Sequence, residues 1–385
     1  MSQFKSIIDL VQQIYDTKDS ISLHEPQFFG NEKLYLNDVI ESTFVSSVGK
    51  YINQFEDTIT KITNTNRAVA VVNGTAGLHT ALRCAGVMEG EIVITQSLTF
   101  IATCNAIKSI GAEPVFLDVS IEGFGLCPNA LSEYLDQFAY VNNDNECCLK
   151  KNDKIIKAVM PMHTFGHPVK LSALVDICNL WNLKLVEDAA ESLGSFYEGQ
   201  HTGTFGEFGV ISFNGNKIVT TGGGGVILCK NKEDGKKVKH ITTTAKVPHL
   251  YEYIHDEVGF NYRMPNLNAA LGCAQLERLD LYLKEKRALA KIYKDFFSST
   301  RFKFVDEPSY AKSNFWLNAI ICKDRNERNR FLNETNAAGI MTRPIWTLMH
   351  NLKMYTNCRR GDLKVSEWLQ DRVVNLPSTP VILQN

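Results

Sequence analysis

The stretch Ser212-Phe213-Asn214-Gly215-Asn216-Lys217 decides how this chain is interpreted, because it places a lysine in a loop of small and polar residues. Two threonines and the glycine run 222–225 follow it. Upstream, the β-type residues of 183–186 end in an acid pair, Glu187-Asp188. The sequence therefore predicts a buried strand that ends in an acid and, after it, a loop that presents a lysine.

This combination is what pyridoxal phosphate chemistry requires. A lysine forms the Schiff base with that cofactor, and an acid keeps its pyridine nitrogen protonated so that the ring accepts electrons. Lys217 and Asp188 are the candidates. Taken singly, each has a plainer explanation, since a strand-end acid also caps turns and most lysines are merely solvated. Their order, in which a glycine-rich turn, an aromatic residue, the acid and the lysine follow one another, favours the cofactor site.

The first 230 residues alternate between short apolar strands and helices, which is typical of parallel βαβ units in a sheet covered on both faces. Strands are predicted at 68–72, 92–94, 113–117, 155–160 and 183–187, and helices at 32–44, 51–63, 78–85, 100–110 and 171–181. The polar segment 142–153 is expected to be a surface loop. A strand-like run, 210–213, follows the glycines of 203–209, so these do not form a dinucleotide-binding fingerprint.

The pattern changes after about residue 230, where a long helical stretch, 266–297, precedes an irregular alternation that includes a strand at 315–322 and a helix at 327–337. We therefore predict an α/β fold with a large domain around a mostly parallel sheet and a smaller C-terminal α+β domain. The expected boundaries are an N-terminal helix and arm at 1–30, the large domain at 31–250 and the small domain at 251–385.

Bulk properties narrow the function classes. The 385 residues carry a net charge of −1 without a long basic run, so no nucleic-acid partner is expected. No apolar stretch approaches the roughly 18–20 residues that span a membrane. The first 19 residues have helical apolar spacing but lack the basic start and cleavage site of a signal peptide, which predicts a cytoplasmic protein. The ten scattered cysteines are expected to be small buried hydrophobes, and no metal site is predicted.

A second motif, Asn73-Gly74-Thr75-Ala76-Gly77, lies between a predicted strand and a helix. Free backbone N–H groups at a helix start bind anions, and small residues let a phosphate come close. The same letters also form ordinary turns and helix caps, so this motif alone leaves both readings open.

These motifs, together with the stretches at 97–103, 187–191 and 259–265, resemble the DegT/DnrJ/EryC1/StrS sugar aminotransferases, which are fold-type I pyridoxal phosphate enzymes. The resemblance runs from about residue 23 to 380. It implies that Lys217 carries the cofactor and shuttles the proton, and that Asp188 pairs with the pyridinium nitrogen. Pyridoxamine phosphate would be the intermediate form of the cofactor, and glutamate the amino donor.

The resemblance also assigns the remaining cofactor contacts. Phe100 would stack on the ring, the turn Gly74-Thr75-Ala76 and Ser212 would bind the phosphate, and Asn261 would reach the phosphate held by the neighbouring subunit of a homodimer with shared sites. Glu191 stands where the family commonly has His or Gln facing the 3-hydroxyl of the cofactor, and it is expected to bind the cofactor.

Further stretches at 30–33, 44–49, 342–350 and 375–378 are similar to enzymes of the legionaminic acid and bacillosamine pathways. Those enzymes aminate C4 of a nucleotide-linked 4-keto-6-deoxy-N-acetylglucosamine, for surface glycans or glycoprotein sugars. The nucleotide, UDP or GDP, is left open. The residues expected to contact the sugar nucleotide are Ser47, Arg263, Arg343, Trp346 and His350.

Three alternatives are weighed. A dehydratase of the same fold replaces the lysine, typically with His, so the presence of Lys217 disfavours it. A relative that aminates C3 or a keto pentose differs only in its substrate. A catalytically silent protein that binds the cofactor is disfavoured because both Asp188 and Lys217 are intact.

Overall fold

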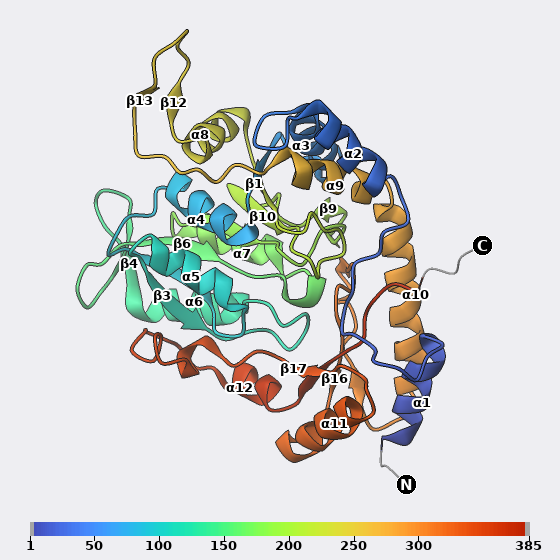
Figure 1. The fold of residues 1–385 in the computed structure, drawn as a ribbon. Helices are drawn as coiled ribbons and strands as arrows, with labels where there is room; N and C mark the ends of the chain where they lie inside the picture. Colours follow the sequence, from blue (N-terminus) through green and yellow to red (C-terminus); the bar gives the residue numbers. More distant parts are fainter. Residues whose placement is uncertain (1–3, 382–385) are drawn as a thin grey trace.

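The structure, a computed structural model, describes residues 4–381 and is built around a seven-stranded sheet (Figure 1). Every neighbouring pair is parallel except those that involve β11, which is antiparallel to both of its neighbours. The strand order is β1 (Arg67–Val71), β11 (Gly225–Cys229), β10 (Phe208–Ser212), β7 (Lys184–Asp188), β6 (Ile156–Met160), β2 (Ile92–Gln96) and β3 (Glu113–Leu117).

The antiparallel strand explains where the lysine loop lies. Strands β10 and β11 are neighbours joined by residues 213–224, which contain no helix, so the chain reverses direction instead of crossing over. The loop therefore emerges at the edge of the sheet where β1 and β7 also end. Lys217 and Asp188 are brought to the same edge by this topology.

Helices cover both faces of the sheet, as the alternation of strands and helices predicts. On one face, α4 (Gly74–Cys84), α5 (Ile101–Ser109) and α8 (Lys232–Thr242) pack on Val93, Val186 and Val210. On the other face, α6 (Pro128–Phe138) and α7 (Leu171–Leu180) pack on strand residues of the opposite parity, such as Ile92, Ile94 and Leu185. The alternating side chains of each strand thus supply two separate cores.

A further helical group closes the β1 end of the sheet (Figure 1). It consists of α2 (Glu32–Ser42), α3 (Lys50–Thr63) and α9 (Asn266–Leu276), with α9 in contact with both of the others. Gly272 allows this close packing, because a Cβ atom there would lie 2.5 Å from the ring of Phe55. The segment 43–49 between α2 and α3 runs over the surface as a loop.

The C-terminal part forms a small antiparallel sheet flanked by helices. Its strand order is β14 (Lys303–Phe304), β16 (Asn318–Ile321), β18 (Val373–Leu376) and β17 (Arg343–Pro344). The long helix α10 (Leu279–Phe297), with α11 (Arg325–Ala337) and α12 (Lys364–Gln370), surrounds it. Helix α1 (Lys5–Ile14) also packs here, with Phe4, Ile7 and Val11 buried in the same core as α10. The domain boundaries at 30/31 and 250/251 stay a prediction.

Two predicted elements differ from the structure. The segment 142–153 is not only a loop: β4 (Ala139–Val141) pairs with β5 (Cys147–Leu149), whose three residues are buried because the cysteines pack as small apolar side chains. Helix α4 begins at Gly74 instead of Leu78, because the Asn73 side chain accepts a hydrogen bond from the Ala76 N–H and caps it.

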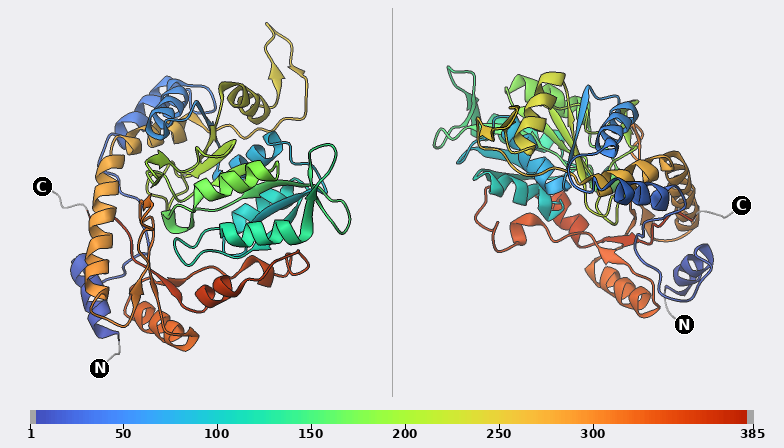
Figure 2. Two further views of the ribbon diagram at one scale, coloured as in Figure 1. Left: turned by 180° about the vertical axis from the view of Figure 1, so that it is seen from behind. Right: turned by 45° about the horizontal axis from the view of Figure 1, so that its top comes forward.

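The remaining strands are short. One hairpin, β12 (Lys246–Val247) with β13 (Ile254–His255), stands clear of the rest of the chain in both Figure 1 and Figure 2. The others, β8 (Phe196–Tyr197), β9 (Gln200–His201) and β15 (Ala311–Lys312), form a three-stranded sheet, and the 3-10 turns are η1 (Thr164–Gly166) and η2 (Met349–Asn351). Across residues 4–381, no helix is both long enough and apolar enough to cross a membrane. All ten cysteines are free thiols, and seven of them are buried.

Candidate active site

A cavity of about 630 Å³ lies at the edge of the sheet where β1, β7 and β10 end. Its walls come from the turn after β1, the turn after β7, the loop between β10 and β11, and the C-terminal part of the chain. The lining residues include Asn73, Gly74, Thr75, Phe100, Asp188, Glu191, Ser212, Lys217, Trp316, Arg343 and Trp346. A single cavity thus joins the lysine loop, the strand-end acid and the glycine-rich turn.

Lys217 reaches the cavity from a loop that its own backbone ties together. Its N–H donates a hydrogen bond to the carbonyl of Asn214 (3.0 Å). The Phe213 N–H donates to the Gly224 carbonyl, and the Phe213 carbonyl accepts a hydrogen bond from the Thr221 N–H. The Lys217 Nζ lies 3.2 Å from Glu191 Oε1 and 3.7 Å from the centre of the Trp316 ring. With its side chain only 13% exposed, the amine is held inside the cavity and not in solvent.

Asp188 is the last residue of β7 and is buried. Its Oδ2 accepts a hydrogen bond from the Thr103 hydroxyl (2.6 Å), and its Oδ1 accepts one from the Ala190 N–H (3.2 Å). Burial raises the pKa of the Asp188 carboxyl, and the Thr103 hydroxyl opposes this. A buried carboxylate that faces a cavity is stabilised by a cationic partner, and a protonated pyridine nitrogen fits that requirement.

Glu191 stands three residues after Asp188 and is also buried. Its Oε1 faces Lys217, and its Oε2 accepts a hydrogen bond from the Phe165 N–H (2.9 Å). Burial raises the pKa of Glu191 to about 7, although the nearby amine of Lys217 lowers it. Glu191 is therefore poised to gain or lose a proton near neutral pH.

This raised pKa predicts a pH-dependent stability of the cofactor-free protein. The folded chain binds the Glu191 proton more tightly than the unfolded chain does, so the free energy of unfolding should fall as pH rises from about 4.5 to about 7. The expected contribution is on the order of 3 kcal/mol. Glu191→Gln should remove this contribution, which urea unfolding of both proteins at pH 5 and pH 7.5 would measure. Equal pH dependence in the two proteins would contradict the assignment.

The start of α4 offers an anion site next to these side chains. The Asn73 side chain takes the Ala76 N–H, whereas the N–H groups of Gly74 and Thr75 have no acceptor within the described residues. Gly225 lets β11 pass close by, since a Cβ atom there would lie 2.7 Å from the Asn73 backbone. Free N–H groups at a helix start suit a phosphate, which is the ligand that the family resemblance implies for this turn. Ala76 is buried and does not line the cavity.

Aromatic side chains form the outer part of the cavity. The rings of Phe100 and Trp346 meet edge to face with centres 6.1 Å apart, and Trp346 also packs on Phe165. Arg343 lines the same region, where its Nη1 donates to Asn336 Oδ1 (2.9 Å) and to the Thr342 carbonyl (2.8 Å). Three of the predicted side chains, Phe100, Arg343 and Trp346, are thus brought together.

Four other predicted residues do not line the cavity of a single chain. Asn261 is exposed and accepts a hydrogen bond from Arg263 Nε (2.9 Å), while Ser47 lies on the surface segment 43–49. His350 lies in η2 and is buried, with its Nδ1 2.8 Å from the Ser97 hydroxyl. The turn of η2 points this imidazole at the residue after β2 instead of at the cavity.

Two residues that contact the acid and the lysine are absent from the site residues predicted from the sequence. Thr103 binds Asp188 from the first turn of α5, and Trp316 packs on Lys217 from a segment about one hundred residues further along the chain. The predicted motif at 97–103 contains Thr103, so a hydroxyl facing the acid was a readable signal. Trp316 carries no such local signal.

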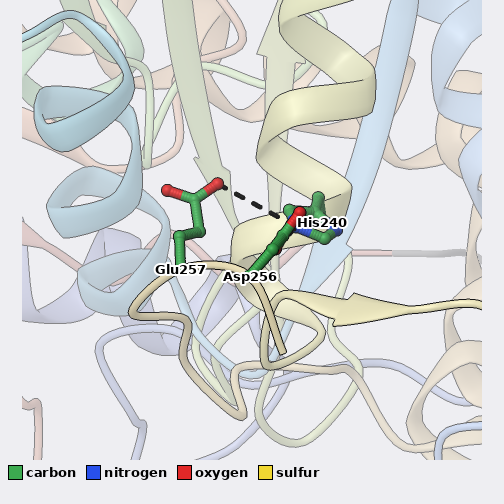
Figure 3. A group of neighbouring side chains, drawn as sticks. All are labelled: His240, Asp256 and Glu257. Carbon is green, nitrogen blue, oxygen red and sulfur yellow. Dashed lines mark hydrogen bonds and ion pairs between the residues drawn. The ribbon is translucent and has the colours of Figure 1, made fainter. Parts of the chain in front are cut away.

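A group of three side chains able to bind a metal, the only one found in residues 4–381, lies elsewhere (Figure 3). His240, near the end of α8, has its Nε2 2.6 Å from Asp256 Oδ1 and 3.9 Å from Glu257 Oε1. Both acids are exposed, and none of the three residues lines the cavity. The His240–Asp256 contact is a surface hydrogen bond at the base of the β12–β13 hairpin.

Comparisons with solved structures agree with this architecture. The aminotransferase TlmJ of Streptoalloteichus hindustanus superimposes with a TM-score of 0.84 at 24% identity, covering 93% of both chains. Helicobacter pylori PseC, an aminotransferase of pseudaminic acid biosynthesis, superimposes with a TM-score of 0.83 at 21% identity, covering 93% of this chain and 94% of that one. At these identities the likeness concerns the fold, which is that of the fold-type I transferases, as predicted.

Sequence comparisons go further. GDP-perosamine synthase of Escherichia coli O157:H7 is 35% identical over 360 residues, which cover 94% of this chain and 93% of that protein. The Bacillus subtilis protein EpsN, named a putative pyridoxal phosphate-dependent aminotransferase, is 33% identical and covers 87% of this chain and 84% of its own. The sequence model of the DegT/DnrJ/EryC1/StrS aminotransferase family matches residues 28–385. The chain therefore belongs to the DegT/DnrJ/EryC1/StrS aminotransferase family and is an aminotransferase that uses pyridoxal phosphate.

Proposed function

We propose that this enzyme transfers the amino group of glutamate to C4 of a nucleotide-linked 4-keto-6-deoxy-N-acetylhexosamine, with UDP or GDP as the nucleotide. The observation that carries the proposal is the position of Lys217 Nζ, enclosed in the same cavity as Asp188 and the free N–H groups of Gly74 and Thr75. The relatives named GDP-perosamine synthase support a nucleotide sugar as the acceptor. The product would serve the biosynthesis of surface glycans, either through a nonulosonic acid such as legionaminic acid or through bacillosamine.

Different residues of the cavity would bind different parts of the cofactor. Lys217 would hold it covalently, Asp188 would pair with the pyridine nitrogen, and Phe100 would cover the ring. Gly74, Thr75 and Ser212 would bind the phosphate, with Ala76 behind them in the first turn of α4. When bound, pyridoxal phosphate supplies a ring that accepts the electron pair released as a substrate carbon loses its proton.

Lys217 would also carry out the proton transfer. When not bonded to the cofactor, its amine would lie free in the cavity and would take a proton from one carbon and return it to another. Glu191, at 3.2 Å, can hold a proton next to that amine, and its pKa of about 7 suits this role at neutral pH. The structure thus places an acid next to the base that would move the proton.

The sugar nucleotide would occupy the outer part of the cavity. Trp346 offers an apolar wall for the hexose, and Arg343 offers a guanidinium that matches phosphate oxygens. His350 faces Ser97 and would act on the sugar only indirectly. Ser47 and Arg263 lie outside the cavity of one chain and would serve only across a subunit interface.

We propose that the enzyme is a homodimer with shared sites. Asn261 is exposed, and the segment around Ser47 displays Phe44, Val45 and Val48 to solvent. The β12–β13 hairpin adds more exposed apolar side chains, with Leu250 95% and Tyr253 83% exposed. Exposed apolar side chains on these two segments support burial against a second copy.

Shared sites predict complementation between two inactive variants. Lys217→Ala and Asn261→Ala each damage both sites of their own homodimers. A hybrid dimer has one doubly altered site and one intact site, so it should regain about half of the wild-type activity. Co-expression with two affinity tags and an assay of the purified hybrid would measure this. A hybrid no more active than either parent would show that Asn261 serves its own chain.

The substrate assignment is tested by product analysis. The enzyme is incubated with glutamate and, in separate reactions, with a UDP-linked 4-keto-6-deoxy-N-acetylhexosamine, its GDP-linked counterpart or a UDP-4-keto pentose. NMR then locates the new amine. We expect an amine at C4 with one of the two nucleotides. An amine at C3, or reaction only with a UDP-4-keto pentose, would replace this proposal by the related alternative in the same family.

A further inference from the structure

We propose that Trp316 is a positioning residue for Lys217, supplied by the C-terminal part of the chain. This inference rests on the proposed function in one respect, since it takes Lys217 as the residue to which the cofactor attaches. The indole of Trp316 contacts the lysine loop at two separate points, and the Trp316 backbone is fixed by buried groups on both sides.

The indole holds both the amine and the backbone next to it. The centre of its ring lies 3.7 Å from Lys217 Nζ, so the electron-rich face of the ring is turned toward the amine. Its Nε1–H donates a hydrogen bond of 2.7 Å to the carbonyl of Asn216, the residue before the lysine. Because Trp316 is only 5% exposed, water does not compete for these contacts.

Trp316 is itself immobilised through its main chain. Its N–H donates to Asn314 Oδ1 (2.8 Å), and its carbonyl accepts a hydrogen bond from Lys286 Nζ (2.6 Å). Lys286 lies in the long helix α10, is fully buried and also donates to the Ser378 carbonyl (2.6 Å). A buried amine whose partners are two carbonyls ties distant segments together, and here it locks the backbone that carries the indole.

The same network reaches the other side of the lysine. Asn314, which binds the Trp316 N–H, donates through its Nδ2 to the carbonyl of Glu191 (2.8 Å). The Lys217 amine is thus held between the carboxylate of Glu191 and the ring of Trp316. The side chain of Asn314 fixes the main chain of both Glu191 and Trp316. This arrangement restrains the free amine of Lys217, so that it stays where the cofactor would attach and does not rotate into the open part of the cavity.

The expected consequence concerns cofactor attachment. In that step Lys217 Nζ bonds to the aldehyde carbon of pyridoxal phosphate, and the aldehyde oxygen leaves as water. A lysine that is already oriented reacts faster and holds the cofactor more tightly than a freely rotating one. Trp316→Phe keeps an aromatic face but removes the Nε1–H, so the Asn216 carbonyl loses its donor. Trp316→Leu removes the face as well.

The test is a double-mutant cycle on cofactor binding, measured on the full chain after removal of the cofactor. We expect Trp316→Phe to weaken pyridoxal phosphate binding, and to slow the appearance of its visible band, by about tenfold, as for one lost hydrogen bond. Trp316→Leu should have a larger effect. In a Lys217→Ala background, where the cofactor binds without a covalent bond, Trp316→Phe should change the affinity by less than about twofold.

Matched controls separate positioning from a structural role. Trp368→Phe makes the same change at a tryptophan that is 40% exposed on α12, and it should leave cofactor binding unchanged. Melting temperatures of all variants show that each is folded under the assay conditions. An equal loss with and without Lys217, or no loss at all, would overturn the inference. A wild-type protein that never develops the band would instead overturn the proposed function.

Discussion

Lys217→Ala should lower the transaminase activity by at least about a thousandfold while leaving the fold intact. The variant lacks both the amine that holds the cofactor and the base that moves the proton. Its Nζ is the cationic partner of Glu191 in the cavity, and no described residue is positioned to replace it. Steady-state turnover with glutamate and the keto sugar, measured on protein saturated with pyridoxal phosphate, tests this directly.

Two comparisons keep this result interpretable. Lys232→Ala removes an exposed lysine from the first turn of α8 and should retain full activity. Added small primary amines should partly restore turnover to Lys217→Ala, because they can enter the space left by the side chain. Turnover within tenfold of the wild type in Lys217→Ala would show that another group performs the chemistry.

Asp188→Asn should be the second most damaging change, with a loss of turnover of about a hundredfold or more. Asparagine has nearly the same shape and can still accept the hydrogen bond from the Thr103 hydroxyl, so the fold should persist. It lacks the negative charge that keeps the pyridine nitrogen protonated. The cofactor should therefore still attach to Lys217 and give a visible band, yet both half-reactions should be slow.

A variant of Thr103, which donates a hydrogen bond to Asp188, serves as the control for Asp188→Asn. Thr103→Val removes the hydroxyl at 2.6 Å but leaves the carboxylate in place, and we expect a loss of no more than about tenfold. Stopped-flow measurement of each half-reaction separates an effect on chemistry from an effect on cofactor binding. Equal effects of Thr103→Val and Asp188→Asn would mean that the charge of Asp188 is not what matters.

Much of the site could be predicted because its central residues lie in local motifs. A strand that ends in an acid and a turn between a strand and a helix are readable from short stretches, and both were located within a few residues. The start of α4 was placed four residues late, since the cap supplied by the Asn73 side chain competes with the turn-like letters around it. Similarly, the polar residues on either side of β5, such as Glu146 and Lys150, mask its buried position in the sequence.

The remaining parts depend on contacts between distant segments. Trp316 donates to the backbone carbonyl of residue 216, and any residue type at that position would offer the same carbonyl. Lys286, which binds the Trp316 carbonyl, looks in the sequence like any other charged residue of a long helix. His350 was expected at the sugar site, but the turn of η2 directs it to Ser97. Asn261, Ser47 and Arg263 lie outside the cavity of one chain, so their assigned roles stay a prediction that only a second copy can fulfil.

The most direct test of the central claim is the visible spectrum of the purified protein, recorded before and after adding glutamate and then UDP-4-keto-6-deoxy-N-acetylglucosamine. A lysine-bound cofactor should give a yellow band that bleaches with glutamate and returns with the keto sugar. A band that bleaches but does not return would keep the aminotransferase and direct the test to the GDP-linked sugar. The absence of a band even after adding pyridoxal phosphate would contradict the assignment of Lys217.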